Sequence, residues 1–283
     1  MSKIKIFKCK AYAKINLFLN VFNKTKDNLH KLRSLVCFVN LHDEIIISEN
    51  KKSVIEIKGP FKNLVDKNNI AEKTYNIFSK FLDIEKKYKI SIYKNIPVSA
   101  GLGGGSADAA AILKGLNYLN KNKVMNKDLY KLAMKIGSDV PACLYNKSVL
   151  FSGYGEILSP VPKIPKFSIL LINPRKELST MKVFNEYKKN KKNKNTMFKN
   201  KDFFSWILKQ NNDLQKYSKK FIPEIEEMLS FLNYSNNCHF SRMTGSGPTV
   251  FGLFKKKKDA KKIDFLLNKV YPNWWSGVYT VKT

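Results

Sequence analysis

The feature that most constrains this chain is a loop with four glycines in five residues, Gly101-Leu-Gly-Gly-Gly105, between a predicted strand and a predicted helix. Because glycine has no Cβ, the backbone of this loop is open to close approach by a polyanion. The helix that follows is expected to begin near Ser106, with its free N–H groups and positive dipole end facing the loop. Ser106 could cap this helix or offer its hydroxyl to a phosphate or to magnesium. The segment Pro97–Ala107 therefore predicts a phosphate-binding loop.

Two common nucleotide-binding motifs do not describe this loop. A P-loop needs Gly-Lys-Ser/Thr after its glycines, and that sequence is missing here. The GxGxxG motif usually follows the first strand of a βαβ unit, with an acidic residue about twenty positions later, and it does not fit either. A flexible glycine-rich turn is the remaining alternative, although such turns seldom lie directly between a strand and a helix.

The charge of the chain raises the question of nucleic-acid binding. The formal net charge is +30, but of the 52 basic residues three are arginine, namely Arg33, Arg175 and Arg242. Arginine is preferred for bidentate recognition of bases and phosphates. Lysines are spread along the chain instead, which favours a solvated surface over a specific nucleic-acid site.

The sequence also bears on compartment. Its longest apolar runs, such as 169–172, are far too short to cross a bilayer, so no membrane partner is expected. The first residues alternate like a strand and do not resemble a signal peptide. The cysteines form no CxxC pair, which argues against a zinc site or a disulfide framework; they are Cys9, Cys37, Cys143 and Cys238. These observations predict a cytoplasmic protein.

The predicted elements indicate an α+β fold, because strands and helices are mixed without strict alternation. The Pro-rich stretch Pro160–Pro165 predicts a domain boundary, with domains at 1–159 and 160–283. The lysine-rich stretch Tyr187–Lys201 is expected to be a mobile loop. Strands are predicted over 3–20, 44–48, 88–93, 167–173 and 249–254, and helices over 68–82, 106–119, 129–136, 225–232 and 260–270.

Three further patterns are ambiguous taken singly. In Gly137-Ser-Asp-Val-Pro141 the aspartate lies on a rigid bend and could act as a general base, although an ordinary turn aspartate is the favoured interpretation from these residues alone. The glycine-rich turn Met243–Thr249 could equally shape a substrate wall or make a tight connection. Lys14 and Asn16 share one side of a strand, where a lone lysine is normally solvated.

Together, in order and spacing, these segments resemble the GHMP kinases. The resemblance rests on Ala13–Leu19, Asn28–Leu32, Ile96–Ala111, Gly137–Pro141 and Met243–Pro248. It implies a two-domain α+β GHMP-kinase fold with the active site in the interdomain cleft. The implied activity is that of a small-molecule kinase, and the resemblance is strongest to members that phosphorylate the 2-hydroxyl of a cytidine diphosphate methylerythritol in the non-mevalonate isoprenoid pathway.

The resemblance also implies roles for single residues. Lys14 and Asp139 match the catalytic pair, Asn16 a residue near the acceptor, and His30 and Phe184 the residues that read the cytosine edge and stack on its face. Asn68 matches an asparagine near the adenine. The ATP loop corresponds to Pro97, Val98, Ser99, Ala100, Gly101, Leu102, Gly103, Gly104, Gly105, Ser106 and Ala107. Mg²⁺ is expected to arrive with ATP, because the sequence shows no dedicated carboxylate cage.

One departure concerns the cytosine pocket. The family usually has Gly-Tyr-His where this chain has Asn28-Leu29-His30, so the tyrosine expected on the second face of the base is missing. Leu29 can still pack there, with less favourable stacking. Homoserine or another small alcohol is the alternative acceptor, and a nucleic-acid-binding protein is the alternative class.

Overall fold

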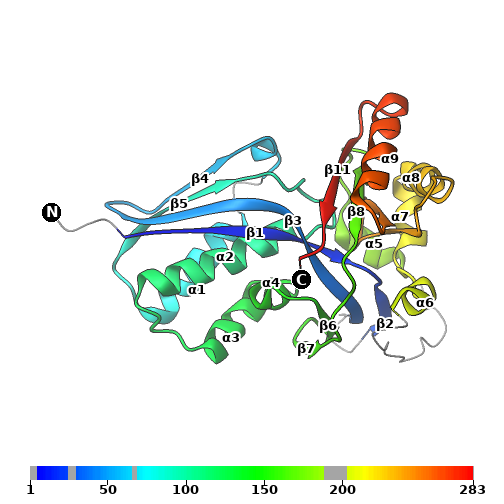
Figure 1. The fold of residues 1–283 in the computed structure, drawn as a ribbon. Helices are drawn as coiled ribbons and strands as arrows, with labels where there is room; N and C mark the ends of the chain where they lie inside the picture. The colour runs from blue at the N-terminus through cyan, green and yellow to red at the C-terminus, as the bar shows by residue number, and fades with distance from the viewer. Residues whose placement is uncertain (1–4, 25–29, 66–68, 188–202, 283) are drawn as a thin grey trace. The chain divides into compact units, whose positions relative to one another are not determined.

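The computed structural model describes residues 5–24, 30–65, 69–187 and 203–282 (Figure 1). The chain forms two compact units that are each discontinuous in sequence. Unit 1 comprises Met1–Lys14, Leu41–Val98 and Gly103–Asn146, and unit 2 comprises Ile15–Asn40, Ser99–Leu102 and Lys147–Thr283. The domains predicted at 1–159 and 160–283 divide the chain once, whereas these units divide it several times. That boundary stays a prediction.

Unit 1 places helices on one face of a sheet (Figure 1). Its strands are most of β1 (Ile6–Asn16), the second half of β3 (His30–Asn50), β4 (Val54–Lys58) and β5 (Lys87–Tyr93). Strand β5 pairs antiparallel with β3, from Glu44 opposite Tyr93 to Asn50 opposite Lys87, and parallel with β4. The helices are η1 (Lys62–Leu64), α1 (Ile70–Leu82), α2 (Gly104–Leu119), α3 (Asn126–Ile136) and α4 (Val140–Tyr145).

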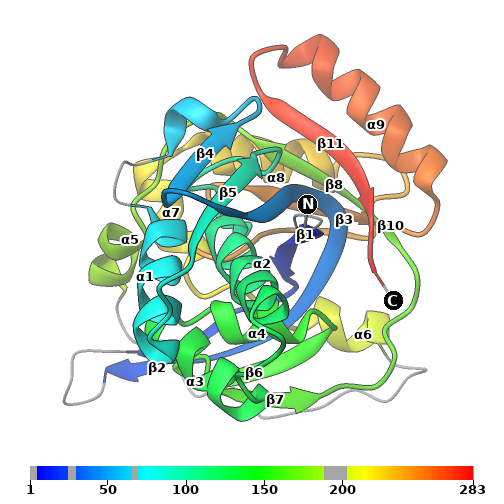
Figure 2. The same cartoon turned by 90° about the vertical axis from the view of Figure 1, so that its left-hand side faces the viewer.

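Helix α2 is the centre of unit 1, and Figure 2 shows α1 and α4 beside it. Its sequence contains three successive alanines, Ala109–Ala111, which are buried and allow close packing on several sides. Gly115 lies so near the strands that a Cβ there would come within 2.5 Å of Phe7 Cδ1 and 2.7 Å of Ile47 Cδ1. Small residues on α2 thus fix the helix that follows the glycine-rich loop against β1 and β3.

Unit 2 contains a four-stranded antiparallel sheet in the order β11-β8-β10-β9. Its strands are β8 (Ser168–Asn173), β9 (Phe240–Met243), β10 (Val250–Phe254) and β11 (Trp275–Thr280), and β8 and β10 are buried throughout, as their apolar runs require. Strands β2 (Asn20–Lys24) and β6 (Val149–Gly153) pair with the first half of β3, and β7 (Ile157–Pro160) pairs with β6. The helices are α5 (Thr180–Glu186), α6 (Phe203–Leu208), α7 (Gln215–Phe221), α8 (Glu224–Asn233) and α9 (Lys257–Val270).

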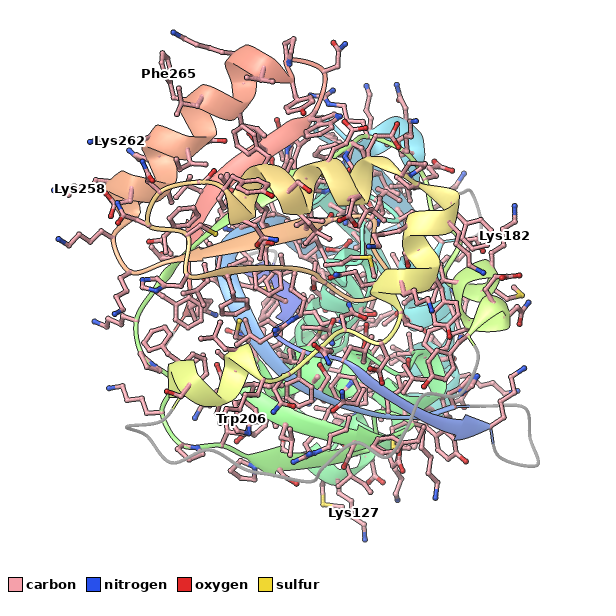
Figure 3. The ribbon with its side chains drawn as sticks, turned by 90° about the vertical axis from the view of Figure 1, so that its right-hand side faces the viewer. Lys127, Lys182, Trp206, Lys258, Lys262 and Phe265 are labelled. Carbon is pink, nitrogen blue, oxygen red and sulfur yellow. The ribbon has the colours of Figure 1, made fainter. Side chains whose placement is uncertain are left out.

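The lysines that dominate the net charge include residues that point outward. Figure 3 shows Lys258 and Lys262 projecting from α9, with Phe265 on the same helix, and Lys182 projecting from α5. In the part of the chain that the structure describes, no helix is both long enough and apolar enough to cross a membrane.

The other predicted elements are found in the described residues, with three corrections. The strand predicted over 3–20 is divided: β1 ends at Asn16 and β2 begins at Asn20. Helix α2 begins at Gly104, two residues before Ser106. Tyr187, assigned to a mobile loop from the lysines that follow it, is buried at 8% exposure and donates a hydrogen bond from its hydroxyl to the Val21 carbonyl at 2.7 Å. The rest of that loop, 188–201, lies outside the described residues.

Candidate active site

The loop that is predicted to bind phosphate runs from the end of β5 to the start of α2. Gly103 is the N-cap of α2 in the left-handed conformation, with φ 64°, which glycine adopts without strain. Since the N-cap is Gly103 and the helix begins at Gly104, Ser106 is the third residue of the helix. It lies in the first turn and does not cap the helix. The first N–H groups of a helix have no intrahelical acceptor, and those of Gly104, Gly105 and Ser106 are in that position. They suit an anion such as a phosphate group.

A buried ion cluster holds both ends of this loop. The Lys94 ammonium donates to Asp43 Oδ2 at 2.5 Å and to Asp108 Oδ2 at 2.7 Å, with all three side chains at most 5% exposed. The other oxygen of Asp43 accepts the backbone N–H groups of Asn95 and Ile96, at 2.6 and 2.8 Å. Because residues 94–96 enter the loop and Asp108 follows it on α2, one cluster fixes entry and exit. Sequence reasoning missed these residues.

Asp108 is the member of this cluster whose pKa is strongly raised. Burial, and secondarily the neighbouring Asp43 carboxylate, raise the pKa of Asp108 to about 8, against the opposing effect of Lys94. Its Oδ1 is buried and has no hydrogen-bond partner among the described residues. A carboxyl group in this environment retains its proton at pH values where an unfolded chain has released it.

This perturbation predicts a pH dependence of stability. Between the ordinary aspartate value of 3.8 and about 8, the folded chain binds a proton at Asp108 that the unfolded chain lacks, so the free energy of unfolding falls as pH rises through that window. We expect Asp108→Asn to flatten this slope in urea titrations from pH 5 to pH 8. Asp128→Asn, at a surface ion pair of 2.8 Å with Lys131 on α3, is the matched control. An unchanged slope in Asp108→Asn would contradict the assignment.

The second glycine-rich turn, between β9 and β10, packs backbone against backbone on the first. A Cβ on Gly101 would lie 2.5 Å from the Thr244 carbonyl oxygen and 2.9 Å from that of Gly247, and one on Gly245 would lie 2.9 Å from the Gly101 carbonyl oxygen. Gly101, Gly245 and Gly247 all have positive φ, at 72°, 58° and 83°. Met243–Thr249 thus makes a tight connection that contacts the first glycine-rich loop, whereas its alternative role as a substrate wall stays a prediction.

Lys14 and Asp139 form an ion pair of 2.8 Å. Lys14 comes from β1 and its side chain is 4% exposed, whereas the Asp139 side chain is 32% exposed. The Lys14 stem also lies against the glycine-rich loop, since a Cβ on Gly103 would lie 2.7 Å from Lys14 Cγ. The pair that the resemblance implied is thus assembled beside the N-terminus of α2.

The structure also shows what the Asp139 side chain contacts. It is the N-cap residue of α4, yet its side chain makes no capping hydrogen bond to the described backbone of that helix. Pro141 in the first turn has no N–H to donate, which removes one of the partners a capping carboxylate could use. The Asp139 carboxylate pairs with Lys14 instead, and its role as a general base stays a prediction.

In unit 2, His30 lies between aromatic rings. Its ring centroid is 5.6 Å from that of Phe184 on α5 and 5.3 Å from that of Tyr187, which meets it edge-on at 87°. His30 Nδ1 is 2.7 Å from the Phe22 carbonyl oxygen, which can only accept, so Nδ1 carries the proton. Nε2 is then an acceptor in the neutral ring, and it is buried without a hydrogen-bond partner among the described residues. Sequence reasoning did not find Tyr187.

Asn16 is buried at the end of β1, and its place near the acceptor stays a prediction. Its N–H donates to Thr244 Oγ1 at 2.9 Å, and its side-chain amide donates to Ser34 Oγ at 2.8 Å. Two other residues of interest, Asn68 and Leu29, lie outside the described residues. The neighbouring Asn69 caps α1 by accepting the N–H groups of Ala71 and Glu72.

Two family profiles match this sequence. The one described as GHMP kinases N terminal domain matches residues 69–147, and the one described as GHMP kinases C terminal matches residues 196–273. A 4-diphosphocytidyl-2-C-methyl-D-erythritol kinase of Ehrlichia ruminantium (strain Gardel) is 40% identical over 278 residues, which are 95% of this chain and 96% of that protein. A protein of the same name from Lachnoclostridium phytofermentans is 36% identical over 265 residues, 91% of each chain.

Solved structures share the fold. The crystal structure of a 4-(cytidine 5'-diphospho)-2C-methyl-D-erythritol kinase matches with a TM-score of 0.77 and 24% identity, over 96% of this chain and 99% of that chain. Homoserine kinase from Cytophaga hutchinsonii matches with a TM-score of 0.70 and 20% identity, over 100% and 96%. The predicted α+β fold is confirmed by these matches, which at such identities concern the fold alone.

Proposed function

Since this chain belongs to the GHMP kinases, and within them to the 4-diphosphocytidyl-2-C-methyl-D-erythritol kinases, we propose that it transfers the γ-phosphoryl group of ATP to the 2-hydroxyl of 4-diphosphocytidyl-2-C-methyl-D-erythritol. This is a step of the non-mevalonate route to isoprenoid precursors. The observation that carries the proposal is the Lys14–Asp139 ion pair, with the Lys14 stem against Gly103 at the start of α2. The four free cysteines, Cys9, Cys37, Cys143 and Cys238, are in keeping with a cytoplasmic location.

Phosphoryl transfer depends on positioning and charge stabilisation more than on covalent chemistry. Asp139, the more exposed member of the pair, accepts the proton of the acceptor hydroxyl or orients it for attack. Lys14 holds this carboxylate in place and offsets the negative charge that develops on the phosphoryl oxygens. Its low exposure strengthens that interaction, because little water competes for the ammonium group.

The ATP phosphates fit the free N–H groups of Gly104, Gly105 and Ser106. Mg²⁺ is proposed to come with these phosphates, as is usual for ions that bind through substrate phosphates and one or two carboxylates. The described residues contain no group of three or more His, Cys, Asp or Glu side chains that is placed to hold a metal ion. The Ser106 hydroxyl, in the first turn of α2, is placed to contact a phosphate or its ion.

His30 and Phe184 are proposed to bind the cytosine. The exocyclic amine of cytosine is a hydrogen-bond donor, whereas uracil has an acceptor at the same position. The unpartnered acceptor His30 Nε2 complements the amine and opposes the uracil oxygen. Phe184 offers a partly exposed ring next to His30 on which a base can stack.

The decisive experiment measures ATP consumption with a panel of acceptors: the cytidine substrate, its uridine analogue, and homoserine. We expect turnover with the cytidine compound and a much lower kcat/KM with the uridine analogue, because a site built to pair a polar group discriminates strongly against a mismatch. Turnover of homoserine, with none of the cytidine compound, would overturn the proposal.

The role of Phe184 gives a separate prediction. Base–aromatic stacking is worth roughly 1–3 kcal/mol per base, so Phe184→Ala should raise KM for the cytidine substrate by about fivefold or more. KM for ATP should stay near its wild-type value. Phe231→Ala, which removes an aromatic ring on α8 that packs edge-on against Tyr271, is the control for loss of an aromatic side chain in the same unit. If Phe184→Ala left KM for the cytidine compound unchanged, this stacking role would be wrong.

A further inference from the structure

Asn212 is a buried residue, 6% exposed, in the short segment between α6 and α7, and none of the sequence motifs includes it. Its side-chain amide nitrogen donates to the carbonyl oxygens of Met243 and Gly245, both at 2.8 Å. Its Oδ1 accepts the N–H of Leu214 at 3.0 Å. Because both carbonyl oxygens can only accept, the nitrogen of the amide must face them. Asn212 therefore uses both its donors on one turn.

That turn is the one that packs on the ATP loop. Between the two carbonyls that Asn212 binds lies Thr244, which is fully buried. The Thr244 hydroxyl accepts the Asn16 N–H at 2.9 Å and lies 3.4 Å from the Gly101 carbonyl oxygen, to which it donates. A displacement of this turn would therefore shift the backbone at Gly101, because the two backbones pack so closely there that not even a Cβ fits between them.

The segment that carries Asn212 is itself fixed from the opposite side. The Leu19 N–H donates to the Asn211 carbonyl at 3.0 Å, and the Asp213 N–H donates to the Leu19 carbonyl at 2.8 Å. The Asp213 carboxylate accepts the Val21 N–H at 2.9 Å. With its backbone held in this way, the Asn212 amide loses little conformational freedom when it binds the turn.

We propose that Asn212 is a positioning residue for ATP binding, which acts through the turn Met243–Gly247 on the conformation of the loop at Gly101. This inference rests on the proposed function in one respect, that ATP is the ligand of the loop. It concerns binding of the nucleotide and not the identity of the acceptor, so the two can fail separately. Asn212 is a positioning residue because its three described side-chain hydrogen bonds are to backbone atoms of this chain.

The test is Asn212→Asp, which keeps the shape of the side chain and replaces the double donor by an oxygen facing two carbonyl oxygens. Asn211→Asp is the matched control, because it adds the same charge one residue earlier on an exposed side chain. We expect the ATP dissociation constant, measured by calorimetry, to rise by about tenfold or more in Asn212→Asp and to change little in Asn211→Asp. Where turnover is measurable, KM for ATP should rise while KM for the acceptor stays within about twofold.

A folded Asn212→Asp protein that binds ATP as tightly as Asn211→Asp would overturn the proposal. So would an equal rise in KM for both substrates, which would indicate general disruption. If wild-type protein binds ATP but fails to phosphorylate the cytidine compound, the proposed acceptor is wrong, and the calorimetric comparison still decides the role of Asn212.

Thr244 provides the comparison if Asn212→Asp does not fold. Thr244→Ser keeps the hydroxyl that links the turn to Gly101, and Thr244→Val removes it at nearly the same volume. We expect ATP to bind severalfold more weakly to Thr244→Val than to Thr244→Ser. Equal affinity of these two variants for ATP would show that the turn does not position the loop, and the role of Asn212 would fall with it.

Discussion

Replacing Asp139 by Asn, or Lys14 by Met, is expected to lower kcat by about a hundredfold to a thousandfold. The estimate is the usual cost of removing one electrostatic contact to a transition state, roughly 3–4 kcal/mol. Both substitutions break the 2.8 Å ion pair while keeping the approximate size of the side chain. ATP affinity should change little, because the backbone N–H groups of α2 are the groups proposed to hold the phosphates. Single-turnover kinetics with saturating ATP, together with calorimetry for ATP, would separate the two effects.

The surface ion pair Lys131–Asp128 supplies the controls, since it has the same 2.8 Å geometry in the same unit. Lys131→Met and Asp128→Asn should retain wild-type kcat, as exposed pairs contribute little. If Asp139→Asn kept a kcat near that of Asp128→Asn, Asp139 would be a structural residue and the proposed mechanism would be wrong.

Gly101→Ala is expected to weaken ATP binding by at least about tenfold. At φ 72° an alanine is strained by roughly 1–2 kcal/mol, and each 1.4 kcal/mol corresponds to a factor of ten. The new Cβ would also meet the Thr244 carbonyl oxygen at 2.5 Å. Since that oxygen belongs to the backbone, the loop or the turn has to move. Calorimetric titration with ATP is the direct measurement.

Gly155→Ala separates backbone strain from damage to the loop. Gly155 also has a positive φ, 105°, but it lies in the connection between β6 and β7. Both variants should lose thermal stability, and Gly101→Ala alone should lose ATP affinity. Equal ATP affinity in the two folded variants would show that the backbone conformation at Gly101 does not affect nucleotide binding.

The parts of this site that could be predicted from sequence are those with local signals. The ATP loop was predicted from glycines between a strand and a helix. The helix after it begins two residues earlier than expected, because its N-cap is Gly103 and not a residue near Ser106. Asp139 alone looked like a turn residue. Its partner Lys14 is far away in sequence, so the pair could be expected from resemblance to a family and not from spacing.

Other residues had no local signal. Asp43 lies within β3 and Lys94 directly follows β5, and charged residues are normally solvated. Both are buried here in ion pairs, Lys94 with Asp43 and with Asp108 of α2. The lysines that follow Tyr187 in the sequence led to the prediction of a mobile loop that included it. Asn212 donates hydrogen bonds to two carbonyl groups that lie 31 and 33 residues later in the chain. The positions of these groups depend on the β9–β10 connection. Tertiary contacts of this kind are invisible to patterns of composition or period.

The discontinuity of the two units has a consequence for synthesis on the ribosome. Residues 15–40 belong to the same unit as residues 147–283, and Asn16 and Arg242 bond across 228 and 225 positions, to Thr244 and Leu17. A nascent chain that has emerged as far as α4 holds both Lys14 and Asp139, but it lacks every later partner of residues 15–40. The contacts of Asn16 with Thr244 and of Leu17 with Arg242 can therefore form only when nearly the whole chain has been translated. Such distant pairing slows folding and leaves apolar strand residues such as Leu17 and Phe18 open to chaperones or to aggregation.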